Sequence, residues 1–253
     1  MNLLPAHTRP KLLDLFCGAG GAGWGYYLAG FDVTGVDNAP QPHYPAALRF
    51  VQADALDYVR EHGHEYAAIH ASPPCQFASI GAKFKGTAHR YSNFIPAARQ
   101  ALNATGKPYI IENVPGAATW LRNPVSLWGD LFGLRVVRVR LFESNFPLAQ
   151  MLLAMRPTVP MVTTASRDSY STFANGASHI TVAGNNYRRE DGALAMGIQW
   201  MTRRELSQAI PPAYTRWIGA QLMTYLRTAR PVDQPGGEAV SDPRTVRDAA
   251  RVV

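Results

Sequence analysis

The stretch that decides the fold is KLLDLFCGAGGAGWGYYLAG, at residues 11–30. Residues 11–16 are mostly apolar and are typical of a buried strand. A glycine-rich run follows, and residues 24–29 then favour a helix that ends at Gly30. A strand, a glycine turn and a helix in this order form the nucleotide-binding unit of doubly wound folds, although a glycine turn can also be an ordinary turn. We therefore predict an α/β fold with a doubly wound, mostly parallel sheet.

Length and composition suit one substantial domain. The 253 residues are 47% hydrophobic, which is enough for an α/β core with a small insertion. No apolar run approaches the ~20 residues of a membrane span, and residues 1–10 lack the apolar core of a signal peptide. The two cysteines, Cys17 and Cys75, make no disulfide framework. We expect a reducing, cytoplasmic compartment and no membrane partner.

The net charge of +7 is unevenly distributed along the chain. Residues 1–130 carry a net charge of +1 and residues 228–253 a net charge of zero. Residues 131–227 carry +6, from eleven Arg, no Lys and five acids. The planar fork of arginine suits phosphates and guanine edges. This excess is either a solvated basic face or a surface for a polyanion, with nucleic acid as the obvious partner.

Cys75 lies shortly after another buried strand, which we predict at residues 66–70. The sequence there continues as Ser72-Pro73-Pro74-Cys75-Gln76, and the prolines stop the strand because they donate no ladder hydrogen bond. Ligands and chemistry collect at the carboxyl ends of strands in open α/β sheets. Cys75 is therefore a candidate nucleophile, or else a buried thiol beside a rigid turn.

Three acids follow other predicted strands. Asp37 stands where such folds bind ribose hydroxyls, although an acid there also caps helices and turns. Asp54 either caps the next helix, contacts an adenine amino group, or does both. Glu112 ends the strand predicted at residues 108–111, and a buried carboxylate needs a partner or a proton. Glu112 is thus a candidate site residue or one half of a structural pair.

Residues 77–90 form a predicted loop with Lys83 and Lys85, which is either phosphate-seeking or an ordinary solvated loop. Residues 136–142 alternate apolar and basic side chains, which predicts a strand with Arg138 and Arg140 on one face. Residues 190–228 favour helices, whereas residues 229–253 are poor in apolar side chains and are expected to be disordered.

Taken together, these motifs resemble those of the DNA (cytosine-5) methyltransferases of the small bacterial or phage type. Residues 14–21 resemble the cofactor motif of that family, and residues 73–76 with Ser79 resemble its nucleophile motif. Glu112-Asn113-Val114 resembles its second catalytic motif, and Arg138 with Arg140 its arginine pair. The resemblance covers residues 11–145 strongly and 190–220 weakly, and the order of the motifs makes it specific.

The resemblance implies a Rossmann-like fold that depends on S-adenosylmethionine (SAM). Residues 11–145 would form the catalytic domain, 146–189 a small inserted target-recognition subdomain, and 190–228 the helices that complete the catalytic domain. The implied partner is double-stranded DNA, bound by a monomer without a metal in the cytoplasm of a bacterial or phage-infected cell.

In the implied reaction, a target cytosine is flipped out of the duplex and Cys75 adds to its carbon 6. Glu112 and Arg140 stabilise the negative charge that builds toward nitrogen 3 and oxygen 2 of the ring, and SAM methylates carbon 5. The implied cofactor-binding residues are Phe16, Gly18, Ala19, Gly20, Gly21, Asp37, Asp54 and Pro74. The implied DNA-binding residues are Gln76, Ser79, Lys83, Lys85, Arg138, Arg188 and Arg189.

The chain departs from the family pattern at three positions and leaves alternatives open. Val136 replaces a glutamine, Gln208 replaces an asparagine, and Asn38 replaces an aromatic residue. Gln208 leaves a modified methyl group possible as the transferred group. An RNA cytosine-5 methyltransferase would use the same chemistry, and a non-catalytic nucleic-acid-binding protein could keep the fold. A zinc base deaminase is excluded, since Ser72 and Ala78 stand where its glutamate and second cysteine are needed.

Overall fold

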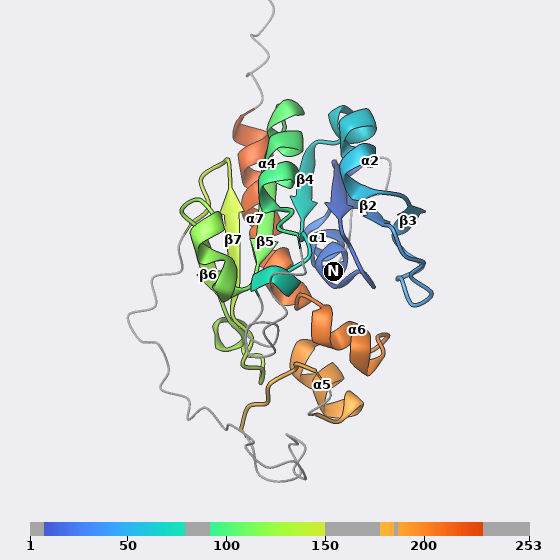
Figure 1. The fold of residues 1–253 in the computed structure, drawn as a ribbon, viewed down its shortest axis with the longest axis vertical. Coiled ribbons are helices and arrows are strands. Elements are labelled where there is room, and N and C mark those ends of the chain that lie inside the picture. Colours follow the sequence, from blue (N-terminus) through green and yellow to red (C-terminus); the bar gives the residue numbers. More distant parts are fainter. Residues whose placement is uncertain (1–7, 79–91, 150–177, 185–186, 230–253) are drawn as a thin grey trace, which may run out of the picture.

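The computed structural model of the chain describes residues 8–78, 92–149, 178–184 and 187–229. Within them, seven strands form one sheet in the order β3-β2-β1-β4-β5-β7-β6 (Figure 1). The strands are β1 (Lys11–Leu15), β2 (Asp32–Asp37), β3 (Arg49–Gln52), β4 (Ala68–Ala71), β5 (Tyr109–Asn113), β6 (Val125–Leu127) and β7 (Arg140–Ser144). Strands β1 to β5 pair in parallel, whereas β7 is antiparallel to both β5 and β6. The predicted doubly wound, mostly parallel sheet is confirmed.

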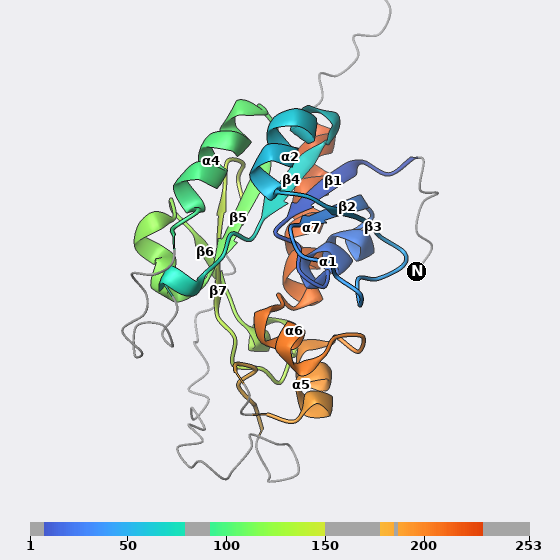
Figure 2. The same ribbon diagram turned by 45° about the vertical axis from the view of Figure 1, so that its right-hand side comes forward.

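Helices cover both faces of the sheet (Figures 1 and 2). One face carries α1 (Gly21–Ala29) and α7 (Pro212–Thr228), and the other carries α2 (Ala55–His62) and α4 (Ile95–Ala104). Short 3-10 helices connect some of these elements: η2 (Gly63–Glu65), η3 (Gln76–Ala78), η5 (Pro115–Trp120) and η6 (Gly129–Phe132).

The central strands alternate between the two faces, as the period of two in a strand requires. Leu13, Ile69 and Ile111 pack under α2 and α4 in one core cluster. The residues that precede them, Leu12, Ala68 and Ile110, pack under α1 and α7 in the other cluster. Continuing along this second face, β1, β4 and β5 place Asp14, His70 and Glu112 in the interior, each less than a tenth exposed. Three titratable groups therefore lie beneath the carboxyl end of the sheet.

A third cluster forms beyond the carboxyl ends of the parallel strands. It includes α5 (Arg189–Met196) and α6 (Arg203–Gln208), with Val136, Ile180 and Leu206 in its interior. Figure 2 shows α5 and α6 below the sheet and away from α2 and α4. The predicted boundaries at 146–189 and 229–253 stay predictions, because residues 150–177, 185–186 and 230–253 lie outside the described part of the chain.

The prediction of a strand at residues 136–142 is wrong for its first part, residues 136–139. Strand β7 begins only at Arg140, because its partner β6 ends in register there, at Leu127. The preceding segment turns to residues 180–182 instead: Val136 forms an isolated parallel bridge with Ile180, and the Val137 N–H donates to the Ile180 carbonyl. Arg138 and Arg140 therefore do not share one strand face. The short strand β6 is missing from the sequence prediction.

Candidate active site

The glycine turn lies directly after β1, as predicted. Gly18 and Gly20 have positive φ angles of 49° and 82°, in the left-handed region that favours glycine. A Cβ at Gly20 would come within 2.8 Å of the Pro45 ring, whereas a Cβ at Gly18 would meet no atom of the described residues within 4 Å. The turn is thus packed against Pro45 at Gly20 and open toward the described residues at Gly18, and this backbone is suited to a ligand. Phe16, which precedes the turn, also has a positive φ of 58°.

Asp37 at the end of β2 holds this turn in place. Its Oδ2 accepts a hydrogen bond from the Gly18 N–H at 3.0 Å, and its Oδ1 accepts one from the Ala39 N–H at 3.1 Å. A carboxylate has about four acceptor positions, so two remain for ribose hydroxyls. The donors of the turn and the acceptors of Asp37 fit the polar groups of a nucleoside, and the cofactor role of Asp37 stays a prediction.

Asp54 caps α2, which is one of the two roles that the sequence indicated. Its Oδ1 accepts from the N–H groups of Leu56 at 2.8 Å and Asp57 at 3.0 Å. Both bonds use the same oxygen, so the cap is compatible with a contact to adenine through Oδ2. That contact remains a prediction.

Cys75 lies on the loop between β4 and η3, and the Pro-Pro turn is anchored to both neighbouring strands. The Ser72 N–H donates to the Leu15 carbonyl at 3.1 Å, and the Asn113 side-chain amide donates to the Pro73 carbonyl at 2.9 Å. Cys75 and Pro74 are half-buried, and Gln76 is exposed. Burial, and secondarily Glu112, raise the pKa of the Cys75 thiol, and Arg140 opposes this shift.

Glu112 and Arg140 form an ion pair across β5 and β7. Arg140 Nε lies 3.0 Å from Glu112 Oε1, and both side chains are largely buried. Burial raises the pKa of the Glu112 carboxyl, whereas Arg140, Arg138 and a hydrogen bond from Ser72 lower it. The structure thus brings together Cys75, Glu112 and Arg140 from three strand ends. Glu112 is therefore one half of a buried ion pair, as the structural alternative predicted. It also remains a candidate site residue, because its partner Arg140 is itself a predicted site residue.

Arg138 lies in the interior instead of facing solvent. Its guanidinium donates to the carbonyls of Val182 and of Ser207, the latter at 2.8 Å, and the Tyr214 hydroxyl donates to the Arg138 carbonyl. Burial, and then the neighbouring Arg140, lower the pKa of Arg138 to about 9. Arg138 ties the third cluster to α7, and its predicted DNA contact is untested.

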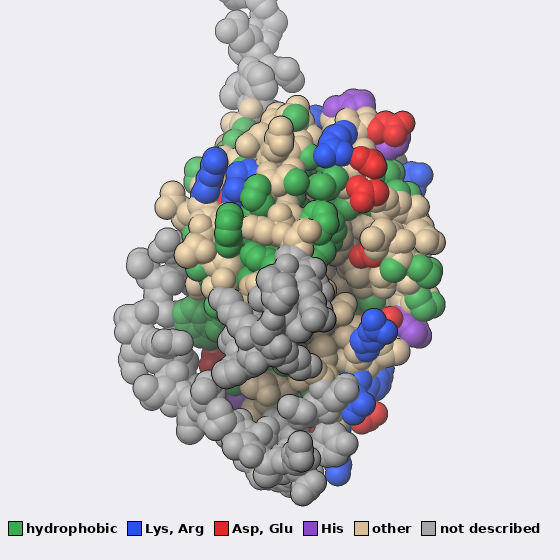
Figure 3. All heavy atoms as spheres, viewed as in Figure 1, with side chains coloured by type: hydrophobic (Ala, Val, Ile, Leu, Met, Phe, Trp, Pro, Cys, Tyr) green, Lys and Arg blue, Asp and Glu red, His purple; other side chains and the backbone are tan. Residues whose placement is uncertain are grey.

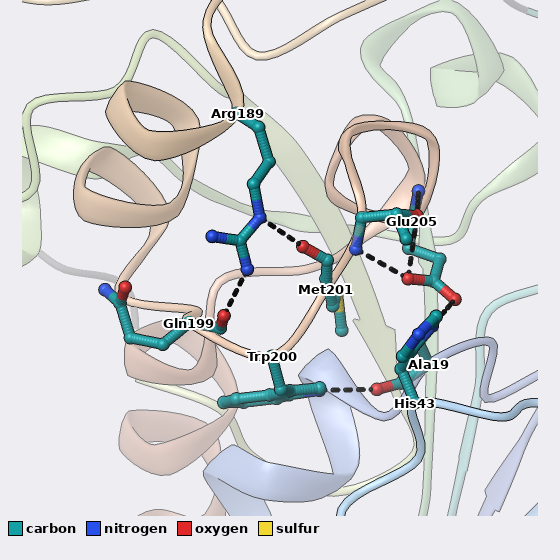
Figure 4. Close-up of polar contacts among 8 residues, drawn as sticks. Ala19, His43, Arg189, Gln199, Trp200, Met201 and Glu205 are labelled. Carbon is teal, nitrogen blue, oxygen red and sulfur yellow. Dashed lines mark hydrogen bonds and ion pairs between the residues drawn. The ribbon is translucent and has the colours of Figure 1, made fainter.

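The α5–α6 region carries further predicted DNA-binding residues. Arg188 is exposed, whereas the Arg189 guanidinium donates to the backbone carbonyls of Met201, at 3.0 Å, and Gln199 (Figure 4). Figure 3 shows Lys and Arg side chains over this part of the surface. The remaining predicted contacts, Ser79, Lys83 and Lys85, lie outside the described residues.

Sequence reasoning missed two groups of residues around the site. Trp200 and Glu205 approach the glycine turn and the loop after β2 from the far end of the chain (Figure 4). Asp14 and His70 lie under the site. Burial is the largest cause of the shift in both pKa values: it raises the pKa of Asp14 to about 8 and lowers the pKa of His70 to about 3. The available signal was a polar residue at alternate positions of otherwise apolar strands.

Comparisons with known proteins support the fold. Neither a protein-family model nor a curated protein sequence matches the chain. Solved structures do match. A putative DNA modification methyltransferase encoded within an E. coli prophage matches with a TM-score of 0.54 and 13% identity, over 86% of this chain and 99% of that one. The S. pombe Dnmt2 methyltransferase matches with a TM-score of 0.56 and 15% identity, over 87% of this chain and 99% of that one. The Entamoeba histolytica methyltransferase EhMeth also matches, with a TM-score of 0.52 and 13% identity, over 87% of this chain and 98% of that one.

The described residues contain neither a helix that could span a membrane nor a cluster of metal ligands. None of the helices in this part of the chain has the length and apolar character needed to cross a membrane. Across the same residues, no three His, Cys, Asp or Glu side chains are grouped as metal ligands would be. The sheet order, the glycine turn and the structural matches together show that this chain has the Rossmann-like fold of the methyltransferases that it matches.

Proposed function

We propose that the chain is a SAM-dependent DNA (cytosine-5) methyltransferase. The observation that carries the proposal is the arrangement of Cys75, Glu112 and Arg140 beside the glycine turn at the carboxyl end of one sheet. Arg140 Nε lies 3.0 Å from Glu112 Oε1, and both charged groups act on the Cys75 thiol. A thiol nucleophile, a buried carboxyl and an arginine are the groups that addition to a cytosine ring needs.

Residues of the glycine turn would hold SAM, with the open Gly18 backbone and Asp37 nearest to its nucleoside. When bound, SAM supplies an electrophilic methyl group. A flipped-out cytosine would place carbon 6 at Cys75 Sγ. The thiolate adds there, and the electron pair of the ring moves toward nitrogen 3 and oxygen 2.

Glu112 in its protonated form would give its proton to nitrogen 3, and Arg140 would hold oxygen 2. Because the ring is then no longer aromatic, carbon 5 becomes nucleophilic. After methylation, the proton on carbon 5 passes to solvent and Cys75 leaves as a thiolate. The proton on nitrogen 3 returns to the Glu112 carboxylate, which restores both the ring and the enzyme. Burial supports the role of Glu112, since it raises the pKa of the carboxyl and favours the protonated form.

The first test finds the substrate. Bisulfite sequencing of DNA from cells that express the protein should show protected cytosines within one short sequence. A duplex with 5-fluorocytosine at that position should then trap the protein, because fluorine does not leave as a proton does. The trapped species should survive a denaturing gel, and peptide mapping should place the nucleotide on Cys75.

Cys17 provides a matched control for Cys75. It is buried in the glycine turn, and burial, Asp14 and Asp37 raise the pKa of its thiol well above the usual range. Cys17→Ser should therefore still be trapped, whereas Cys75→Ser should bind SAM but lose nearly all transfer. Glu112→Gln should also be slow, because an amide delivers no proton to nitrogen 3. An adduct on Cys17, or trapping on matched RNA but not on DNA, would contradict the proposal.

A further inference from the structure

A chain of hydrogen bonds leads from α1 to Ser72. The Tyr26 hydroxyl lies 3.0 Å from His70 Nδ1, and His70 Nε2 lies 2.8 Å from Ser72 Oγ. Ser72 in turn acts on the Glu112 carboxyl as a hydrogen-bond donor that lowers its pKa. Tyr26 and His70 are both fully buried, and their rings lie 5.3 Å apart. None of these three residues belongs to the cofactor or DNA contacts described above.

The donors and acceptors of this chain favour one direction. Burial lowers the pKa of His70 to about 3, so the ring is neutral and carries one N–H. If Tyr26 donates to Nδ1, then Nε2–H donates to Ser72, and the Ser72 hydroxyl is left to donate to Glu112. In the reverse direction the Tyr26 hydroxyl would need a second acceptor, and within the described residues it makes only the bond to His70.

We propose that Ser72 is a positioning residue for Glu112, and that His70 and Tyr26 hold its hydroxyl as a hydrogen-bond donor. The inference rests on the proposed function. A hydroxyl rotates freely unless a neighbour fixes it, and His70 is that neighbour. When the Glu112 O–H passes its proton to nitrogen 3 of the ring, the carboxyl becomes a carboxylate. The Ser72 O–H then stabilises the new charge, and no proton leaves His70 or Tyr26.

The other groups that act on Glu112 come from three sides. Arg140 and Arg138 face it from the β7 side, Asp14 from β1, and Cys75 from the loop after β4. His70 itself faces Tyr26 on α1 and Ser72. Ser72→Ala removes none of these charged or titratable groups. A change in the pH dependence of transfer therefore reports on that hydroxyl.

The sign of the pH effect follows from the hydrogen bond. The Ser72 bond lowers the pKa of Glu112, so its removal raises that pKa further. Transfer needs a Cys75 thiolate and a protonated Glu112, so each of these two groups sets one limb of the pH–rate profile. Loss of the hydroxyl should move the limb that Glu112 sets to higher pH and leave the limb that Cys75 sets in place. It should also slow the step in which the carboxylate forms.

The experiment compares Ser72→Ala with Ser72→Thr, which keeps a hydroxyl. The Ser72 backbone N–H bond to Leu15 is the same in both. Single-turnover methyl transfer is measured across pH, together with SAM affinity and thermal unfolding. Loss of a hydrogen bond to a charged group predicts a roughly ten- to hundredfold slower transfer for Ser72→Ala with unchanged SAM affinity. Ser72→Thr should retain most of the rate and the original position of the limb that Glu112 sets.

A second pair of variants tests the role of His70. His70→Gln keeps an N–H near the position of Nε2 and should behave like the wild type, whereas His70→Leu should repeat the Ser72→Ala profile. A wild-type rate and an unmoved Glu112 limb in Ser72→Ala would overturn the inference and leave the proposed function intact. Equal slowing in Ser72→Ala and Ser72→Thr with an unmoved Glu112 limb would also overturn it. A wild-type protein that transfers no methyl group would instead reject the proposed function.

Discussion

The indole N–H of Trp200 donates to the carbonyl of Ala19 at 2.9 Å, across 181 positions of the chain. This bond joins the segment between α5 and α6 to the glycine turn (Figure 4). Trp24 on α1 packs edge-on against the Trp200 ring, and the His43 ring lies 2.9 Å from the Glu205 carboxylate nearby. The proposed cofactor site is therefore completed by residues that lie far from it in the sequence.

Trp200→Phe tests whether this contact supports the turn. Phenylalanine keeps an aromatic ring but donates no hydrogen bond, and a lost bond of this kind costs about 1 kcal/mol. We expect SAM affinity in calorimetry to fall several-fold and the melting temperature to drop by a few degrees. Trp217→Phe on α7 is the control and should change stability without changing SAM affinity. Unchanged SAM affinity in Trp200→Phe would assign the bond to folding alone.

Asp37→Ala should weaken SAM binding by about 1–3 kcal/mol, because it removes a charged acceptor and the partner of the Gly18 N–H. Calorimetric titration of SAM measures this change. Asp32→Ala is the control, because it removes the same charge at the opposite, exposed end of β2 and should leave SAM affinity unchanged. Equal SAM affinities in the two variants would remove Asp37 from the cofactor site.

Substitutions of the two arginines at the start of α5 should change the salt dependence of DNA binding. Each phosphate contact that is lost should reduce the slope of log affinity against log salt by about 1. We expect Arg188→Gln and Arg189→Gln each to flatten the slope, measured by fluorescence anisotropy. Arg189→Gln should also lower the melting temperature, because its guanidinium holds the carbonyls of Gln199 and Met201. A slope that neither variant changes would mean that these arginines serve the fold.

Asp14 makes the stability of the protein depend on pH. Burial, as the largest cause, raises its pKa from 3.8 to about 8, so between these values the folded state keeps a proton that the unfolded state has lost. The free energy of unfolding should therefore fall as pH rises through this window, by about 1.4 kcal/mol per pH unit at most. His70 contributes the opposite slope between pH 3 and 6.5, because its pKa is lowered to about 3.

Urea unfolding at pH 6.5 and pH 8 isolates the effect of Asp14 from that of His70. Asp14→Asn cannot lose a proton and should show a smaller fall in the free energy of unfolding than the wild type. Asp32→Asn, at an exposed position, should behave like the wild type. If Asp14→Asn kept the full wild-type slope, Asp14 would not be the group that titrates.

The sequence was sufficient for features that depend on neighbouring residues. The alternation of apolar side chains and the glycines after Leu15 indicated strands, a turn and a helix, because these are properties of the local backbone. The same reasoning indicated Asp54 as a helix cap, which the structure confirms. It also indicated Cys75 and Glu112 as neighbours, since the carboxyl ends of parallel strands meet at one edge, whereas the family resemblance indicated Arg140, which begins the antiparallel strand β7.

Tertiary structure decided the features that depend on packing between distant segments. Strand β7 begins at Arg140 only because β6 ends opposite it, and Arg138 is buried because the carbonyls of Val182 and Ser207 lie within its reach. Asp14 and His70 are perturbed because α1 and α7 exclude water from their face of the sheet. Apart from β6 and the start of β7, the sequence by itself thus determined the elements and their order, whereas desolvation and the choice of hydrogen-bond partners arose only when the elements packed together.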